Sequence, residues 1–220
     1  MGKLKAEALR RILKNTEKTS RVIIPPSPGF DSGAHELDDR RCMVISTDPC
    51  LGGPKEWFGW LLINYAASDV AIFGAKPQFC TVNLLAPDEQ SQNQFRTIMK
   101  QASMAAENLD MTIITGHTGT YSELSTMIGV CTAYGFVERD MLVTPAGAKS
   151  GHYLICTKPL GLETLINFSL TQRELAIDLF GRKKMLEFTK QIDVQTCVKE
   201  ALLLSRSGLV EAMHDATEGG

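Results

Sequence analysis

Two aspartates in apolar surroundings are the residues of this chain best suited to chemistry. Asp48 follows the apolar run Cys42 to Ile45, which is typical of a buried strand, and Asp69 lies within the helical run Ile63 to Phe73. A carboxylate is costly to bury unless it is paired or binds a metal ion. Two carboxylates on neighbouring elements suit Mg²⁺, a hard cation that takes oxygen ligands and shares them with phosphates. The pair therefore indicates a magnesium site that binds ATP.

Both aspartates also have structural explanations. Asp48 could cap a turn before Pro49, and Asp69 could accept hydrogen bonds from backbone amides in a packed helix. A third acidic residue, Asp31, stands in the turn Gly29 to Gly33, where aspartate is a common turn former. We keep Asp31, Asp48 and Asp69 as candidate metal ligands.

A glycine-rich segment, Gly116-His117-Thr118-Gly119, follows a predicted strand and offers backbone amides to a phosphate. No Gly-Lys-Ser/Thr sequence follows it, so it is not a Walker loop, and an ordinary loop is the alternative. His117 could donate to a phosphate or transfer a proton near neutral pH, or it could be a structural histidine. We take these four residues as candidate nucleotide contacts.

The last residues of the sequence form a further candidate segment. His214 and Asp215 could orient a substrate or a water molecule, and we take them as candidate catalytic residues. Gly219 and Gly220 let the backbone approach a ligand closely, so they are candidate nucleotide contacts. If the fold beyond Gly220 is absent, we expect this segment to be frayed and inactive.

Hydrophobic periodicity and turn signals predict the elements that position these residues. The proline-rich connector Pro25 to Gly29 excludes helix and central strand, and a hairpin-like turn is expected at residues 38–40. The predicted helices cover residues 3–16, 57–73, 87–109, 162–168, 173–180 and 194–205. The predicted strands cover residues 42–47, 79–85, 111–115, 126–137 and 152–157.

A turn-rich segment, Pro145 to Gly151, is the best candidate for a domain boundary. It divides the chain into an N-terminal domain, residues 1–148, and a second unit, residues 149–220. A unit of about 70 residues is marginal as an independent core. We therefore expect the second domain to be incomplete within this sequence.

Composition excludes several classes of partner. The chain has 44% hydrophobic and 22% charged residues and a net charge of −2, which gives no general attraction to nucleic acid or to anionic membranes. No apolar run approaches membrane-spanning length, and the charged N-terminus has no signal-peptide core. Six cysteines without a CxxC pair favour reduced thiols over disulfides or zinc. We expect a cytoplasmic protein that binds neither nucleic acid nor membrane.

Taken in order, these motifs resemble the superfamily of aminoimidazole ribonucleotide synthetase. Its members include thiamine-monophosphate kinase, selenophosphate synthetase, phosphoribosylformylglycinamidine synthase and the hydrogenase-maturation dehydratase. This chain looks most similar to the hydrogenase-maturation (expression/formation) branch. The matching pieces are residues 29–34, 46–49, 66–77, 114–119 and 214–220.

The resemblance implies two domains of α+β and α/β architecture. An N-terminal mixed sheet with helices would form a β-barrel with a second copy, and a C-terminal α/β layer would cover the nucleotide. The family transfers phosphate from ATP, with Mg²⁺, to a carbonyl, amide or thiocarboxamide oxygen. The three candidate metal ligands match positions near magnesium, Thr118 matches a nucleotide-contacting segment, and Asp215 with the final glycines matches a loop near the reacting groups.

This chain departs from the family pattern at several positions, and these departures argue against some of the family's activities. Phe30 precedes Asp31 where the kinase branch has adjacent aspartates, which argues against thiamine-phosphate kinase. Selenophosphate synthetases use an N-terminal cysteine or selenocysteine, yet no cysteine precedes Cys42. Ser68-Asp69 stands where several relatives have Asn-Asp. The hydrogenase-maturation dehydratase carries its substrate on a C-terminal cysteine, whereas this sequence ends in Gly220.

We therefore expect an ATP- and Mg²⁺-dependent homodimeric enzyme of hydrogenase maturation, which works with a partner protein that carries the substrate. A purine-biosynthesis cyclo-ligase is an alternative of the same chemical class. A non-catalytic nucleotide-binding or assembly subunit, which keeps the dimer but lacks a complete second domain, is the alternative of a different class.

Overall fold

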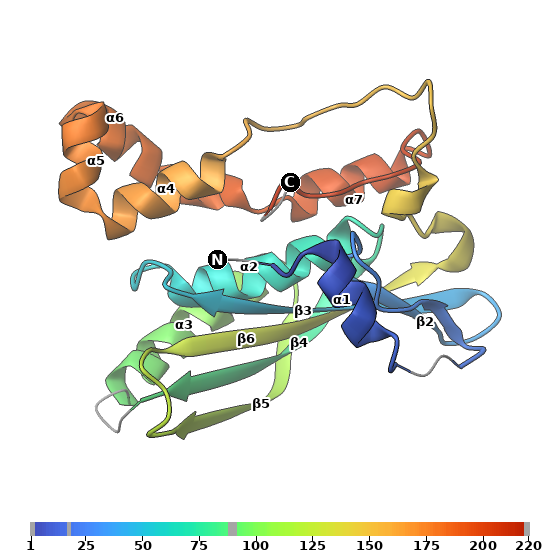
Figure 1. Cartoon of the computed structure of the whole chain (residues 1–220), viewed down its shortest axis with the longest axis horizontal. Coiled ribbons are helices and arrows are strands. Elements are labelled where there is room, and N and C mark those ends of the chain that lie inside the picture. The colour runs from blue at the N-terminus through green and yellow to red at the C-terminus, as the bar shows by residue number, and fades with distance from the viewer. Residues whose placement is uncertain (1–2, 17–18, 88–91, 218–220) are drawn as a thin grey trace.

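A mixed sheet carries Asp48 and residues 116–119 and supports the other elements of the described chain (Figure 1). The computed structural model of the chain describes residues 3–16, 19–87 and 92–217. The sheet has the strand order β1-β2-β3-β6-β4-β5, and neighbouring strands are antiparallel except β4 and β5, which are parallel. The prediction of a mixed sheet with helices is confirmed. The strands are β1 (Val22–Ile24), β2 (Gly33–Glu36), β3 (Arg41–Leu51), β4 (Lys76–Ala86), β5 (Thr112–Thr120) and β6 (Ile128–Glu138).

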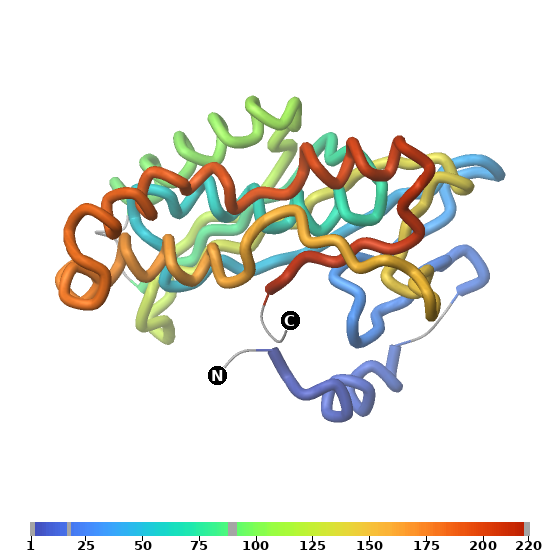
Figure 2. Tube along the Cα trace, turned by 90° about the horizontal axis from the view of Figure 1, so that it is seen from above, coloured from blue at the N-terminus to red at the C-terminus, as the bar shows by residue number. Residues whose placement is uncertain are grey.

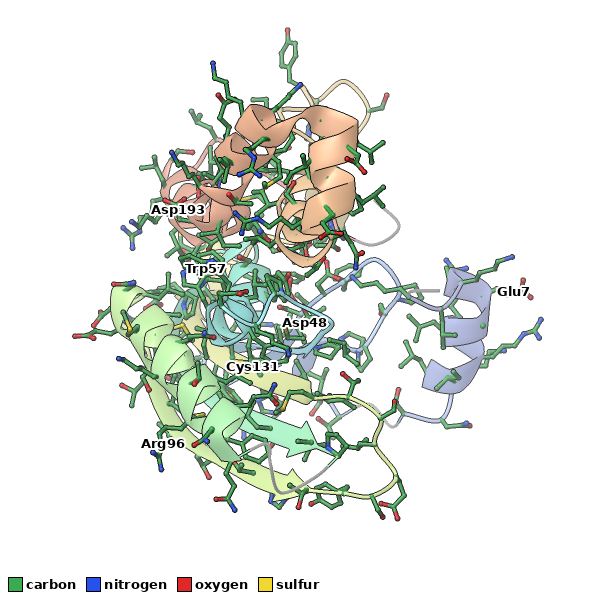
Figure 3. The ribbon with its side chains drawn as sticks, turned by 90° about the vertical axis from the view of Figure 1, so that its left-hand side faces the viewer. Glu7, Asp48, Trp57, Arg96, Cys131 and Asp193 are labelled. Atoms are coloured by element: carbon green, nitrogen blue, oxygen red, sulfur yellow. The ribbon has the colours of Figure 1, made fainter. Side chains whose placement is uncertain are left out.

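Two layers of helices cover one face of this sheet. Helix α2 (Phe58–Ala71) packs on β3, β4 and β6, and α3 (Gln92–Asn108) lies beside α2 and reaches β5. The outer layer, above α2 in Figure 3, contains α4 to α7, and α7 lies against α2. Helix α1 (Ala6–Leu13) buries none of its residues. The outer helices are α4 (Leu162–Thr171), α5 (Arg173–Phe180), α6 (Arg182–Thr189) and α7 (Val198–Arg206).

Helix α2 is buried on all sides, which explains its uniformly apolar sequence. The sheet lies on one side of it and α7 on another, and twelve of its fourteen residues are buried. A helix that is hydrophobic all round belongs in a core. The predicted packed helix over residues 57–73 is confirmed within two residues at each end, and Asp69, only 6% exposed, is part of it.

Strand β3 extends farther than predicted and contains Asp48. The expected strand ends at Thr47, whereas β3 pairs with β6 as far as Leu51. Since β2 pairs with β3 only up to Ile45, the rest of β3 has an open edge, where a proline such as Pro49 is tolerated. Side chains alternate along a strand, so Asp48 faces the same side as the buried Ser46, toward α2.

The glycine-rich segment 116–119 is the second half of strand β5 and not a loop. A Cβ on Gly116 would lie 1.9 Å from the carbonyl oxygen of Val82 in β4, so glycine is needed for the two strands to approach. Glycine in a strand often marks such a close approach. The sequence pattern alone does not distinguish this role from a phosphate loop.

The C-terminal third differs most from expectation. The predicted strand at residues 152–157 is wrong, because this segment is irregular and Tyr153, Leu154 and Ile155 are 96%, 100% and 78% exposed. A strand needs a partner for its backbone groups, and none lies beside this segment in the described chain. Among described residues 149–217 there are helices and no strand. The predicted C-terminal α/β layer therefore stays a prediction.

Two other predictions concern the N-terminal helix and the closure of the barrel. The predicted N-terminal helix is shorter, since α1 covers only Ala6–Leu13. The strands in the described ranges form an open sheet, so the barrel closure remains a prediction that concerns a second copy. None of the helices in the described part of the chain combines the length and the apolar character that a membrane crossing needs.

The contact between α2 and α3 gives a test of the fold. A Cβ on Gly59 would lie 2.1 Å from the carbonyl oxygen of Ile98 and 2.7 Å from the Ala102 nitrogen. We expect Gly59→Ala to lower the free energy of unfolding by about 3 kcal/mol, as overpacking does. Chemical denaturation measures this, with Ser103→Ala on the exposed side of α3 as control. A loss below about 0.5 kcal/mol in Gly59→Ala would contradict the close crossing.

Candidate carboxylate site

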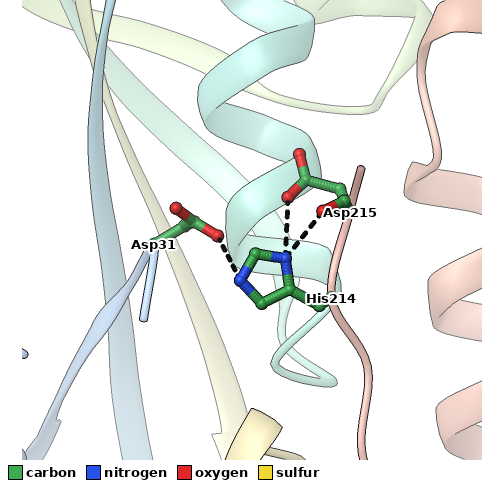
Figure 4. A group of neighbouring side chains, drawn as sticks. All are labelled: Asp31, His214 and Asp215. Carbon is green, nitrogen blue, oxygen red and sulfur yellow. Dashed lines mark hydrogen bonds and ion pairs between the residues drawn. The ribbon is translucent and has the colours of Figure 1, made fainter. Parts of the chain in front are cut away.

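Residues distant in the sequence meet beside the N-terminal end of β2. Asp31 lies in the turn before this strand, and His214 and Asp215 come from the extended segment after α7 (Figure 4). His214 Nε2 is 3.2 Å from Asp31 Oδ2, and His214 Nδ1 is 3.5 Å from Asp215 Oδ1. One potential ligand atom from each residue lies within 4.8 Å of the others. The structure thus brings together three of the predicted site residues.

Ser46 joins this group to Asp69. The Ser46 hydroxyl lies 2.7 Å from Asp69 Oδ2 and 3.1 Å from the Asp31 carbonyl oxygen. A hydroxyl has only one proton to donate. Both contacts are satisfied together if Asp69 is protonated, because it then donates to Ser46 while Ser46 donates to the Asp31 carbonyl. The Ser32 hydroxyl also donates to the Asp69 carbonyl oxygen at 2.9 Å and fixes α2 to the Asp31 turn.

The pKa values of the carboxyls reflect burial and crowding. Burial raises the pKa of Asp69 to about 8 against the lowering effect of the Ser46 hydroxyl, and the neighbouring carboxylates raise it further. Burial raises the pKa of Asp48 to about 6, although the Lys3 ammonium lowers it. The pKa of Asp215 is also raised, first by burial and then by the charge of Asp31. The cluster is therefore short of positive charge.

The carboxylate oxygens of this site suit a hard divalent cation. Asp31 Oδ2 and Asp215 Oδ1 are buried and accept no well-formed hydrogen bond from the described residues. The His214 ring approaches them at 3.2 Å and 3.5 Å as ion-pair contacts. Carboxylate oxygens are the ligands that Mg²⁺ prefers, and a cation would relieve the repulsion that raises the pKa values. His214 is not a usual magnesium ligand; it lies between two of the carboxylates and holds them together.

A second polar group connects α2 to the outer helix α4. The Tyr65 hydroxyl of α2 donates to Glu163 Oε1 of α4 at 2.7 Å, and Asn167 Nδ2 donates to the Tyr65 hydroxyl at 3.2 Å. Glu163 is also one of the charges that raise the pKa of Asp48, after burial and the nearer carboxylates. The network therefore fixes α4 beside the carboxylates.

The other predicted site residues lie elsewhere. Gly116, His117, Thr118 and Gly119 are on β5, and strands β6 and β4 separate β5 from β3. At about 4.8 Å per strand this places β5 roughly 14 Å from β3 across the sheet. His117 Nε2 lies 2.7 Å from the Tyr121 hydroxyl in an exposed pair. Gly219 and Gly220 lie outside the described residues.

Sequence reasoning missed Lys3 and the role of Ser46. Lys3 Nζ lies 3.0 Å from Asp31 Oδ1 and 3.3 Å from the Thr217 hydroxyl. No local pattern distinguishes Lys3 from the other basic residues near the N-terminus. The position of Ser46 could have been predicted, because it lies two residues before Asp48 on a strand and its side chain must point to the same face of the sheet.

The raised pKa of Asp69 predicts how stability depends on pH. An aspartate has a pKa of about 3.9 when unfolded. Since the folded pKa is higher, the folded state binds the extra proton between about pH 4 and 8, and its stability falls as pH rises through that window. We expect the metal-free protein to lose free energy of unfolding from pH 5 to 9 and Asp69→Asn to flatten the slope.

Denaturant unfolding at several pH values measures this slope. Asp178→Asn, at an exposed aspartate of α5, is the control and should keep the wild-type dependence. An equally steep slope in Asp69→Asn would show that another group causes the pH dependence.

Comparison with known proteins agrees with this architecture. Residues 29–137 match the model of the AIR synthase related protein, N-terminal domain. A selenide, water dikinase of Bdellovibrio bacteriovorus is 31% identical over 171 residues, which cover 74% of this chain and 48% of that protein. A putative hydrogenase expression/formation protein of Methanocaldococcus jannaschii is 25% identical over 232 residues, which cover 100% of this chain and 64% of that protein.

A solved structure shares the fold. AaThiL complexed with AMPPCP and TMP has a TM-score of 0.69 at 16% identity, and the match covers 91% of this chain and 61% of that one. The chain spans about half the length of the selenide, water dikinases that it matches. The resemblance seen in the ordered motifs is confirmed. Residues 29–137 of this chain are an AIR synthase-related N-terminal domain.

Proposed function

We propose that this chain supplies the metal- and phosphate-binding half of an ATP-dependent enzyme. The observation that carries the proposal is the convergence of Asp31, Asp48, Asp69 and Asp215, in which two buried carboxylate oxygens accept no well-formed hydrogen bond from the described residues. These four residues would hold Mg²⁺. When bound, the ion would neutralise the phosphates of ATP and the charge that develops during phosphoryl transfer.

The chain's own residues would prepare this site. Ser46 would hold Asp69 in place as the carboxyl loses its proton, and Ser32 would keep α2 against the Asp31 turn. His214 bridges Asp31 and Asp215 and could move a proton between the site and a substrate. The Tyr65–Glu163 contact would hold α4 over the site. These groups position and neutralise, which is most of what phosphoryl transfer requires of a protein.

The favoured reaction transfers phosphate from ATP to a carbonyl, amide or thiocarboxamide oxygen, with a role in hydrogenase maturation and a partner protein that carries the substrate. The likeness to the Methanocaldococcus jannaschii protein over the whole chain supports this role. A purine-biosynthesis cyclo-ligase would use the same site. The AMPPCP bound by AaThiL, which shares the fold, supports ATP as the cofactor. We also propose a cytoplasmic location, in keeping with six free cysteines.

We also propose that the chain is a homodimer through the uncovered face of its sheet. The helices that pack extensively on the described sheet, α2 and α3, lie on the other face. On the uncovered face, Phe79 stacks on Tyr134 at 5.1 Å between ring centroids and lies 5.7 Å from Phe136. Such a face needs apolar cover. In such a dimer, residues 116–119 of one copy would contact a nucleotide bound by the second copy.

The domain division at residues 148 and 149 also remains part of this proposal. The boundary turn packs against the segment that leads to His214, since a Cβ on Gly147 would lie 1.9 Å from the Glu211 carbonyl oxygen. The second unit would thus position the catalytic candidates at the edge of the first.

Removing a metal ligand tests the proposed activity. We expect wild-type protein with Mg²⁺ and AMPPCP at about 100 times the dissociation constant to gain about 2.7 kcal/mol of stability. Asp48→Asn and Asp69→Asn should each lose this gain while the dimer persists, and Asp178→Asn should keep it. Thermal unfolding with and without Mg²⁺ measures the gain within each variant, so changes in basal stability cancel.

The same measurement distinguishes the proposed enzyme from a non-catalytic assembly subunit. A dimer that gains nothing from nucleotide would support the non-catalytic assembly subunit. An undiminished gain in both aspartate variants would contradict the proposed metal ligands.

The proposed dimer face has its own test. We expect Phe79→Glu to convert the dimer to a monomer at micromolar concentration, because a carboxylate would have to be buried at the interface. Tyr153→Glu is the matched control, since Tyr153 is 96% exposed on another part of the chain. Light scattering after size-exclusion chromatography gives the mass, and circular dichroism checks the fold. A dimer that survives Phe79→Glu would place the interface elsewhere.

A further inference from the structure

Lys3 brings a positive charge to the carboxylate site from the far end of the sequence. Its ammonium contacts Asp31 Oδ1 at 3.0 Å and the Thr217 hydroxyl at 3.3 Å. Burial alone would lower the pKa of Lys3, but the hydrogen bond and charge of Asp31 and the charges of Asp215 and Asp69 raise it. Figure 2 shows the start of the described chain beside the extended segment that ends at residue 217. Lys3 therefore joins the two ends of the described chain across the acidic site.

The N-terminal segment, residues 3–14, has few other attachments. Helix α1 buries none of its residues, and Leu4 and Ile12 are 59% and 56% exposed. The segment carries five basic residues against one acidic residue, Glu7. With almost no apolar burial to hold it, its attachment to the body of the protein is mainly electrostatic. Among the described residues, the Lys3 ammonium makes this contact.

A metal ion bound by the carboxylate cluster would remove the attraction between Lys3 and Asp31. A divalent cation on Asp31 would neutralise the charge that attracts Lys3 and repel the ammonium at close range. Lys3 is 51% exposed on its side chain, so the ammonium can leave toward water without crossing the protein. Metal and lysine therefore compete for the same carboxylate.

We propose that Lys3 is a counter-ion of the carboxylate cluster, which anchors residues 3–14 to the site and is displaced when a divalent cation binds. The proposal rests on the proposed function, because it needs the cluster to bind metal. We call residues 3–14 the strap, because this segment would detach from the site when the metal ion binds. Binding of metal would then loosen part of the protein, which is the opposite of the usual effect of a ligand.

Limited proteolysis of the full chain tests this strap. A protease specific for arginine can cut α1 after Arg10 or Arg11, and neither test substitution creates or removes an arginine. We expect Mg²⁺ to accelerate this cleavage several-fold in the wild type. Lys3→Gln should be cut at the fast rate even without metal, whereas Lys5→Gln, which keeps Lys3 and its contacts, should behave like the wild type.

Calorimetric titration of the same proteins with Mg²⁺ completes the test. Loss of the competitor should tighten the Mg²⁺ dissociation constant of Lys3→Gln by about three- to fivefold, the scale of one partly exposed ion pair. Mg²⁺ binding that leaves cleavage unchanged or slower, or a weaker affinity in Lys3→Gln, would overturn the strap and leave the metal site intact. No Mg²⁺ binding to wild type or Lys3→Gln would overturn both the strap and the proposed function.

Discussion

The mutual repulsion of buried carboxylates is the constraint on which the rest of this structure depends. Asp69 is fixed in the most enclosed helix of the fold, and its carboxyl faces the Asp31 turn through Ser46. Asp48 and Asp215 add charge from β3 and from the C-terminal segment. Without metal, the site balances this charge with a proton on Asp69 and with the ammonium of Lys3. A divalent cation would take the place of both positive charges, the proton on Asp69 and the ammonium of Lys3.

The fold brings this cluster together by rigid packing around α2. The sheet, α3 and α7 enclose α2, so Asp69 cannot move away from its neighbours without disturbing the core. The other members come from less constrained parts, namely the turn before β2 and the segment after α7. A rigid acidic residue surrounded by more adaptable ones suits a site that alternates between a metal-free and a loaded state.

Much of this arrangement could be predicted from the sequence. The run of small and apolar residues identified α2, and the motif order identified the family, because both signals are local or ordered along the chain. The strand predicted at residues 152–157 failed for a physical reason: strand propensity describes a surface that needs a partner, and the described chain offers none. The phosphate-loop prediction for residues 116–119 could not be separated from close packing of β5 on β4, since glycine serves both.

The contacts of Lys3 and Ser46 lay beyond sequence reasoning for another reason. Lys3 meets Thr217 across almost the whole length of the chain, and no local pattern encodes such a contact. Ser46 matters because of the protonation state of Asp69, which depends on burial that appears only in the folded protein.

The central claim is that the cluster is a cation site which holds a proton in place of its metal. Calorimetric titration with Mg²⁺ at pH 7 in two buffers of different ionisation enthalpy counts the protons released on binding. Asp69, with a pKa of about 8, is mostly protonated at this pH and must ionise to bind the metal. We predict a net release of protons, which Asp69→Asn reduces. Mg²⁺ binding without proton release, or no binding at all, would contradict this account.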